Sequence, residues 1–599
     1  MALAVTLELR SLVGVSSNGD SRPRIERALG PAVVGASAVL YVATAARTIL
    51  GGDNGEFATL AATGGVAHPP GYPLYVLWLR AMRWLPGVSP AHRAALATAI
   101  LGVAAIWVLQ RAAHAWGASA RAAALASAIF ATSSLSWMLA TEAEVFSANA
   151  LLALAIVWAS APDLPLSGAR RTAVLGLLAG LGLAVHHSIV LLAPLGLFAA
   201  IVAVRDARGR RIGAVAAGLG GLAVGLLPYL QLVLGARAAE RDGVWAWGDT
   251  RDVHGLLQHF FRADYGTLQL GVNDLPKEPG AQLVLLSKDL FFDFFGLPAF
   301  ALLAAVATYA RTRRRPRGAT LALLAAFLLA GPVFVSRFNT PPRGIGASIV
   351  ERFHLLPGAL ACVLAAIAIG PILARVRVEI AALATLAVAA FGALLAYPDV
   401  REHHRPTVQL YAENVMGMLP PNAIVIGSGD HRMGAFLYER AIGTRPDVVF
   451  INPWLLLGDW YAERASRQLG ISVVRAHDGV VNADALFTQL LGTGRPVFVT
   501  DWFAPGVDKL RPSYPLGPVI RLVESPAELP APAQLASMND AKLATFVFED
   551  DLPERGTWAG DLQADYARPW VVLQGAFLHT GDLAAAERAG ERVKALTPR

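Results

Sequence analysis

Cysteine and charged residues are both scarce in this sequence. Its 599 residues include one cysteine, Cys362, which lies within an apolar run, so a disulfide framework is excluded and thiol redox chemistry is not expected. Only 16% of the residues are charged, whereas 55% are hydrophobic. A soluble globule cannot bury that much apolar surface. The composition therefore predicts a polytopic α-helical membrane protein.

Long basic runs are also absent, although the net charge is +7. The positive residues form short clusters between apolar runs, which is where membrane topology places them, so we expect no nucleic-acid partner. The first residues lack the basic start of a cleavable signal, and Arg22, Arg24 and Arg27 come just before the first long apolar run. Residues 1–29 are therefore predicted to be a cytoplasmic segment that is retained.

Apolar runs of near-bilayer length predict about eleven transmembrane helices within residues 30–397. With eleven spans, every basic cluster falls on one side of the membrane, which the positive-inside rule makes cytoplasmic. The clusters are Arg22 to Arg27, Arg170 and Arg171, Arg205 to Arg211, Arg311 to Arg317, and Arg375 and Arg377. The opposite face then receives two long loops, 51–91 and 236–285, and most of the unusual polar residues.

Two segments outside the spans have their own character. The stretch from Tyr72 to Leu85 is apolar but short and contains two arginines, which favours an amphipathic helix on the outer surface; a bent span is the alternative. Residues 398–599 contain short β-branched runs with helices between them. They predict an extracytoplasmic α/β domain with a small, largely parallel sheet, ending in a helical hairpin like one tetratricopeptide unit.

The loop after the first span carries two carboxylates, Asp53 and Glu56. A carboxylate at the end of a rigid helix can act as the base for an acceptor hydroxyl, and a second one can orient it, raise its pKa or share a metal ion. The alternative is structural, with Asp53 capping a helix and Glu56 favouring its dipole. The same loop ends in a proline-rich turn that fixes His68, which could lie near a donor phosphate or near the two acids. The alternative is that the turn is only a rigid connection into the next helix.

Other external residues are candidates for binding. Arg337 and Arg352 could stabilise a phosphate leaving group through their guanidinium groups, and snorkelling to lipid phosphates is the alternative. Trp247 could stack on a sugar and Asp249 could hold its hydroxyls, unless the tryptophans form an interfacial belt. The Gly427 to Asp430 turn follows a predicted strand, and we expect it to dock an acceptor or cap the site.

A series of sequence blocks extends this interpretation. The blocks are DNGEF, VAHPPGYPLY, TEAEVFSANAL, GLAVHHSIVLLAPL, WGDTRDVHGLLQHFFRADYG, ERFHLLP and LPPNAIVIGSGD. In this order they resemble a bacterial membrane-protein family of the GT-C glycosyltransferase superfamily, related to the eukaryotic endoplasmic-reticulum O-mannosyltransferase that acts on IPT domains. The resemblance covers most of residues 30 to about 470 and departs from the family at Asn54, where serine is expected.

The resemblance implies an inverting transferase that moves a hexose, mannose in the related enzyme, from a polyprenyl-phosphate donor to a protein or glycan hydroxyl. Asp53 would be the base, Glu142 and Glu144 would bind sugar or acceptor hydroxyls, and His186 or His187 would face the site. The protein would lie in a bacterial inner membrane with its C-terminal domain in the periplasm. No cofactor is required, although a divalent cation could assist. A lipid or sugar transporter and a non-catalytic membrane scaffold are the alternative functions.

Overall fold

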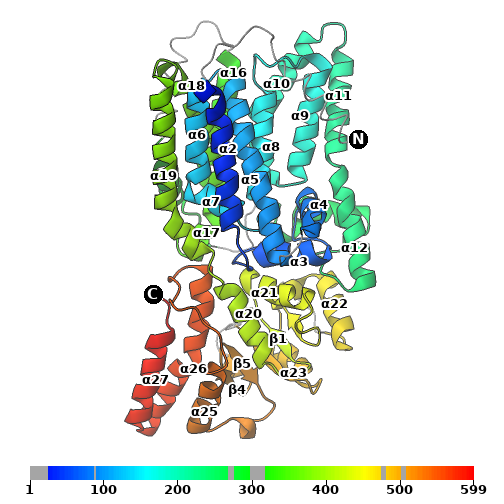
Figure 1. Cartoon of the computed structure of the whole chain (residues 1–599). Helices are drawn as coiled ribbons and strands as arrows, with labels where there is room; N and C mark the ends of the chain where they lie inside the picture. Colours follow the sequence, from blue (N-terminus) through cyan, green and yellow to red (C-terminus); the bar gives the residue numbers. More distant parts are fainter. Residues whose placement is uncertain (1–23, 86–88, 268–274, 297–316, 474–480, 501–506) are drawn as a thin grey trace.

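The computed structural model describes residues 24–85, 89–267, 275–296, 317–473, 481–500 and 507–599. The N-terminal two thirds form a helical bundle, and the C-terminal third forms a mixed α/β region below it (Figure 1). The bundle helices are Arg24–Thr44 (α2), Asn54–Thr63 (α3), Pro73–Ala81 (α4), Pro90–Ala115 (α5), Ala120–Thr132 (α6), Ser134–Ala140 (α7), Phe146–Ala159 (α8), Gly168–Leu183 (α9), Ala193–Asp206 (α10), Arg211–Gly225 (α11), Leu230–Asp242 (α12), Val253–Phe260 (α13), Pro279–Phe292 (α14), Arg317–Leu328 (α16), Ile345–Glu351 (α17), Leu355–Leu373 (α18) and Val378–His403 (α19).

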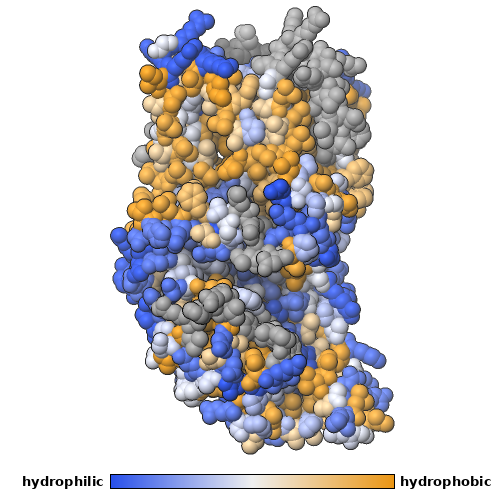
Figure 2. All heavy atoms as spheres, turned by 180° about the vertical axis from the view of Figure 1, so that it is seen from behind, coloured by the Kyte–Doolittle hydropathy of each residue, from blue (hydrophilic) through white to orange (hydrophobic). Residues whose placement is uncertain are grey.

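The bundle has the length and surface of a membrane-spanning domain. Six helical stretches in the described residues are long and apolar enough to cross a bilayer, or seven if one bent pair counts as a span. Hydrophobic side chains cover the bundle surface, whereas hydrophilic side chains dominate the C-terminal third (Figure 2). The protein is therefore a multi-pass helical membrane protein. The predicted count of eleven spans stays a prediction, and most of the Arg311 to Arg317 cluster lies outside the described residues.

Several apolar runs are interrupted, which explains why counting them overstates the number of long helices. Ser133 caps α7 by accepting a hydrogen bond from the amide of Ser136 at 3.2 Å, and the chain bends by 68° between α6 and α7. The segment from Tyr72 to Leu85 forms α4 and one 3₁₀ turn. At nine residues, α4 is about 14 Å long and too short to span a bilayer.

The C-terminal third is built on one five-stranded sheet. Its elements are Thr407–Met418 (α20), Ile424–Ile426 (β1), Asp430–Ala441 (α21), Val449–Ile451 (β2), Asp459–Leu469 (α22), Ala483–Leu491 (α23), Val497–Val499 (β3), Val507–Leu510 (α24), Ser513–Leu516 (β4), Val519–Leu522 (β5), Pro532–Leu543 (α25), Trp558–Thr580 (α26) and Leu583–Leu596 (α27).

The strand order is β2-β1-β3-β5-β4. Strands β2 and β3 pair parallel to β1, with Val449 and Val497 both opposite Ile424, while β5 and β4 add antiparallel. The β-branched residues of the central strands are buried between helices, as expected for parallel strands. A short turn, residues 427–429, joins the carboxyl end of β1 to α21.

Helix α21 packs directly on α3, the helix that follows the first span. At their crossing, a Cβ atom built on Gly434 would lie 3.2 Å from the Cα atom of Gly55, and one built on Gly55 would lie 2.5 Å from the carbonyl carbon of Gly434. Two glycines thus let the helices approach at backbone distance. This contact holds the first turn of α21 over the loop that contains Asp53.

Candidate active site

A cavity of about 390 Å³ lies between the end of the bundle and the C-terminal third. Seven of the predicted site residues come together in its wall, although they are distant in sequence. The lining includes Asp53, Glu56, His68, Tyr72, His186, His187, Trp247, Arg262, Tyr265, Arg352, Asp430 and Trp558. The connections α10–α11 and α18–α19, which carry two of the basic clusters, lie at the other end of the bundle (Figure 1). The polar cavity and these clusters therefore occupy opposite ends of the bundle.

Arg352 joins two carboxylates in this cavity. Its Nη1 atom donates to Asp53 Oδ2 at 2.8 Å and to Glu144 Oε1 at 2.6 Å. Asp53 stands at the start of α3 but makes no side-chain cap there, so its carboxylate is turned to the guanidinium instead. The neighbouring Asn54, at the position where the family resemblance leads one to expect serine, accepts a hydrogen bond from the amide of Leu50 at 2.9 Å. Asn54 thus fixes the loop without entering the cavity.

The two carboxylates on Arg352 differ in their proton affinity. Burial would raise the pKa of Asp53, but the charges of Arg352 and His68 outweigh it and hold that pKa below its usual range. Burial dominates at Glu144, and with the nearby Asp53 it raises the pKa of that carboxyl. Environments that push two neighbouring pKa values apart separate a base from an acid. Asp53 is therefore the member of the pair that stays ionised.

Glu56 organises the opposite wall through both carboxylate oxygens. Its Oε2 atom lies 2.6 Å from His68 Nδ1, and its Oε1 atom accepts from the amide of His68 at 3.1 Å and from the Trp245 indole at 2.9 Å. Tyr72 contacts the other ring nitrogen of His68 at 2.9 Å. Burial alone would lower the pKa of His68, but Asp53 and Glu56 raise it to about 9. The proline-rich turn thus holds a cationic imidazolium in the cavity.

Both adjacent histidines reach the cavity. The backbone at His186 is extended, with φ −160° and ψ 133°, and both side chains line the cavity wall. His186 Nδ1 lies 2.8 Å from the Ser188 hydroxyl, and His187 Nε2 lies 3.1 Å from the Tyr229 hydroxyl. Burial lowers the pKa of His186 well below its usual value, so this ring is neutral.

Four of the predicted site residues do not line the cavity wall. Glu142 is buried beside the site but its Oε2 atom bonds His403 Nε2 at 3.0 Å. Asp249 is exposed and forms two short hydrogen bonds with Arg251, of 2.6 and 2.7 Å. Arg337 is exposed on the bundle and does not line the cavity. Glu144 is not in the wall either, but it reaches the site through Arg352.

Four further residues line the cavity. Arg262 and Tyr265 follow Trp247 along the chain, and the rings of Tyr265 and Trp247 stack at 6.4 Å. Asp430 and Trp558 come from the C-terminal third. Burial and the charge of Asp53 raise the pKa of Asp430 to about 6. Asp430 ends the Gly-rich turn after β1, so the strand-turn signal pointed to it, whereas no sequence pattern marks Trp558.

A metal ion finds no ready ligand set here. Within the described parts of the chain, no group of three or more histidine, cysteine or carboxylate side chains is arranged to hold one. The cavity instead offers the two guanidinium groups of Arg262 and Arg352, the imidazolium of His68, carboxylates and an aromatic wall. Such a set can bind a phosphate, stack on a sugar ring and accept a proton.

Known proteins resemble this chain in sequence and in fold. A family model described as the N-terminal domain of the protein O-mannosyl-transferase TMEM260 matches residues 53–209. The mouse protein O-mannosyl-transferase TMEM260 is 28% identical over 462 residues, covering 73% of this chain and 64% of the mouse protein. This chain is therefore similar in sequence to protein O-mannosyl-transferases named TMEM260. The predicted resemblance to that enzyme is confirmed, whereas the bacterial origin stays a prediction.

One further relative in sequence and one similar structure were found. The Dictyostelium discoideum protein O-mannosyl-transferase tmem260 is 28% identical over 249 residues, which is 39% of this chain and 30% of that protein. The alignments thus span less than two thirds of either TMEM260 relative. The crystal structure of ArnT from Cupriavidus metallidurans bound to undecaprenyl phosphate has a TM-score of 0.53 at 16% identity, covering 83% of this chain and 98% of ArnT. This chain therefore shares its overall fold with ArnT.

Proposed function

We propose that this chain is a membrane glycosyltransferase that moves a hexose, mannose in our assignment, from a polyprenyl-phosphate donor to a hydroxyl group of a protein acceptor. The observation that carries the proposal is the contact of Arg352 with Asp53 inside a cavity at the end of the bundle. The relation to proteins named protein O-mannosyl-transferase supports the sugar and the acceptor, and the fold shared with ArnT, crystallised with undecaprenyl phosphate, supports the donor.

In the proposed reaction, the acceptor hydroxyl oxygen attacks the anomeric carbon and the bond from that carbon to the phosphate oxygen breaks. Asp53 accepts the hydroxyl proton, and polyprenyl phosphate leaves with both bonding electrons. One displacement inverts the anomeric configuration. Arg352 stabilises the negative charge that develops on the phosphate as the bond breaks. Electrostatic stabilisation of this kind is usually the largest single contribution to catalysis.

The contact between Arg352 and Asp53 gives the order of events a physical basis. A donor phosphate competes with Asp53 for the guanidinium, because guanidinium groups bind phosphate oxygens in bidentate fashion. Once Arg352 turns to the phosphate, Asp53 loses its main stabilising charge and becomes a stronger base. The base is thus activated only when the leaving group is in place. His68 and the stacked rings of Trp247 and Tyr265 orient the sugar in this proposal.

The direct test uses protein reconstituted in nanodiscs with polyprenyl-phosphate mannose, glucose or N-acetylglucosamine, and measures released polyprenyl phosphate. We expect release with mannose, and a fall of about 10² to 10⁴ in turnover for Asp53→Asn, the range that general-base catalysis contributes. Asp163→Asn, the same change at an exposed carboxylate, is the matched control. Undiminished turnover in Asp53→Asn would reject the base assignment, and absence of release from every donor would favour a transporter or scaffold.

A further inference from the structure

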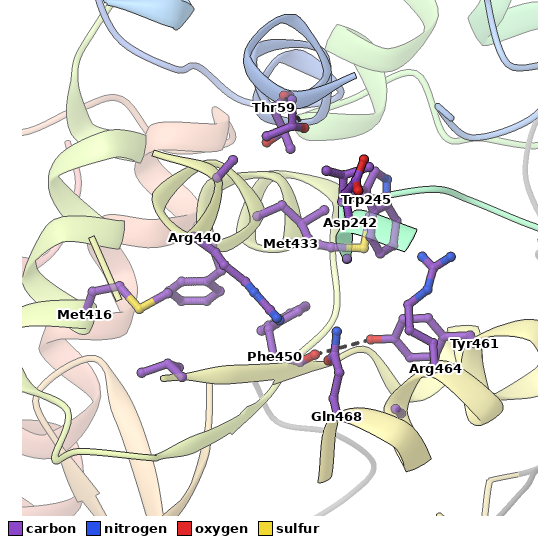
Figure 3. Close-up of a pocket in the computed structure, with 18 residues that line it drawn as sticks. Thr59, Asp242, Trp245, Met416, Met433, Arg440, Phe450, Tyr461, Arg464 and Gln468 are labelled. Atoms are coloured by element: carbon purple, nitrogen blue, oxygen red, sulfur yellow. Dashed lines mark hydrogen bonds between the residues drawn. The ribbon is translucent and has the colours of Figure 1, made fainter. Parts of the chain in front are cut away.

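A second pocket of about 230 Å³ adjoins the cavity on the side of the C-terminal third. Helix α3 forms its roof, α21 and α22 form two sides, and the chain after α12 closes it with Trp245 (Figure 3). Nothing in the proposed reaction uses this pocket. Its chemistry therefore needs a separate explanation.

Two guanidinium groups without carboxylate partners line the pocket. Arg440 of α21 and Arg464 of α22 extend into the space between their helices (Figure 3), and neither forms an ion pair within the described residues. Arg464 donates to the carbonyl of Ala246 and lies over the rings of Trp245 and Trp460, at 5.8 and 5.5 Å. Burial lowers the pKa of both arginines, so their charges are incompletely solvated.

The nearby acid does not neutralise them. Asp242 also lines the pocket, but it is exposed, and its Oδ2 atom bonds Arg241 at 2.7 Å. Both arginines line the pocket, so an anionic group bound there would receive charge-assisted hydrogen bonds from them. The pocket is thus suited to an anionic group.

The other walls indicate that the anion is part of a larger apolar ligand. Met416, Met433 and Phe450 line the pocket beside the arginines (Figure 3). Methionine side chains adapt to differently shaped hydrocarbon groups. A carboxylate carried on a short hydrocarbon side chain fits such a wall better than a bare ion or a polar glycan. An acidic residue of a polypeptide has this chemistry.

The pocket is joined to the proposed site by two side chains. Met433 lines both the pocket and the larger cavity. Trp245 lines the pocket and donates its indole hydrogen to Glu56 Oε1, which in turn holds His68. The pocket thus lies next to the part of the cavity wall that contains Met433 and Glu56.

We propose that this pocket is an acceptor subsite that binds an acidic side chain of the polypeptide, near the hydroxyl residue to be modified. The proposal rests on the proposed function, because it assigns the acceptor of that same site. Arg440 and Arg464 bind the carboxylate, and Met416, Met433 and Phe450 contact its hydrocarbon stem. The enzyme would thereby select threonine or serine residues that have an acidic neighbour.

The test measures binding of labelled peptides to the full chain in nanodiscs without donor, by fluorescence anisotropy. Each capped peptide contains one threonine and one glutamate at varied separation, and its matched peptide contains glutamine instead. At the best separation we expect the glutamate peptide to bind about tenfold more tightly, the size of one charge-assisted hydrogen bond. Arg440→Gln should abolish this preference and Arg440→Lys should keep part of it. Arg467→Gln, an exposed arginine on the same face of α22, should leave it unchanged.

Equal binding of the two peptides to the wild type at every separation would overturn the proposal, as would a full preference in Arg440→Gln. Release of polyprenyl phosphate to water is also measured without peptide in Arg440→Gln. If this release and the peptide preference were lost together, the pocket would be assigned to the donor phosphate and the proposal would be overturned. Peptide selection needs no donor, so a chain inactive with every sugar lipid would reject the proposed function while leaving the peptide result readable.

Discussion

Arg352 is the residue on which the geometry of the candidate site depends. It is 18% exposed at the side chain and contacts two carboxylates from different parts of the chain, Asp53 and Glu144. A buried guanidinium between two carboxylates contributes little net stability, because desolvation offsets most of the attraction. The arrangement is better explained by function, since it places the Arg352 guanidinium where a donor phosphate could bind it.

His68 gives the site a pH dependence that can be measured. Its pKa is raised to about 9, so its charge stabilises the folded protein fully below the ordinary value near 6.5, and this contribution is lost as the pH rises through 9. We expect His68→Gln to be less stable than the wild type by up to about 3 kcal/mol at pH 6, with the difference shrinking as the pH rises from 6.5 and nearly gone above pH 9. Thermal unfolding in detergent across this pH range checks the prediction.

The matched control for this prediction is His579→Gln, which removes an exposed histidine of α26. Its difference from the wild type should stay small at every pH. If His68→Gln showed the same difference at pH 6 as at pH 10, the charged form of His68 would not be what the carboxylates of Asp53 and Glu56 stabilise.

The crossing of helices α3 and α21 positions the part of the cavity wall that α21 supplies, Asp430 and Met433. We expect Gly434→Leu to force the helices apart, because even its Cβ atom would lie 3.2 Å from Gly55 Cα. Overpacking of this kind costs about 1–3 kcal/mol. Turnover should fall as well, since Asp430 and Met433 would move away from Asp53. Thermal unfolding and polyprenyl-phosphate release measure the two effects.

Gly417→Leu is the control for this helix contact. Gly417 is also helical and lies on an exposed side of α20, where a Cβ atom added to it would meet no other atom within 4 Å. The substitution should leave unfolding and turnover nearly unchanged. Equal effects of the two leucines would show that the glycine contact does not position α21.

The predicted residues that line the cavity include three that are close in sequence. Asp53, Glu56 and His68 lie within one loop, and a carboxylate pair before a rigid turn marks that loop without knowledge of the fold. Arg352 lies 299 positions from Asp53, yet counting spans assigned both to one membrane face. The guanidinium contact itself could not be predicted, because a span count fixes the side of the membrane and not the neighbours within it.

The contribution of the C-terminal third could not be predicted in the same way. Trp558 reaches the cavity because the start of α26 packs on the loop at Gly51, where a Cβ atom would overlap the Trp558 side chain. A close contact that depends on a single glycine leaves no periodic pattern in the sequence, so it could not be predicted. Likewise, bends such as the one at Ser133 depend on a single cap, so apolar runs predicted the bundle but not the shapes of its helices.

At the scale of the whole molecule, the bundle and the C-terminal third act as one site only while they stay docked. Arg405, just after α19, fastens them: its Nη1 atom bonds Glu402 Oε2 at 3.1 Å, and its Nε atom lies 3.1 Å from Glu549 Oε2. Glu402 also accepts from the amide of Glu554 at 2.9 Å. These contacts hold the segment that leads to Trp558.

We therefore expect Arg405→Gln to loosen the cover of the cavity without unfolding the bundle. Removing one partner from a buried ion pair leaves uncompensated carboxylates, at a cost of several kcal/mol, so amides in residues 549–562 should exchange about tenfold faster or more. Hydrogen-exchange mass spectrometry in nanodiscs measures this, and turnover should fall in parallel because Trp558 lines the cavity. Arg592→Gln breaks an exposed pair with Asp540 and should change neither quantity. Unchanged exchange in Arg405→Gln would mean that the glycine contact between α3 and α21 holds the two parts together without this ionic fastening.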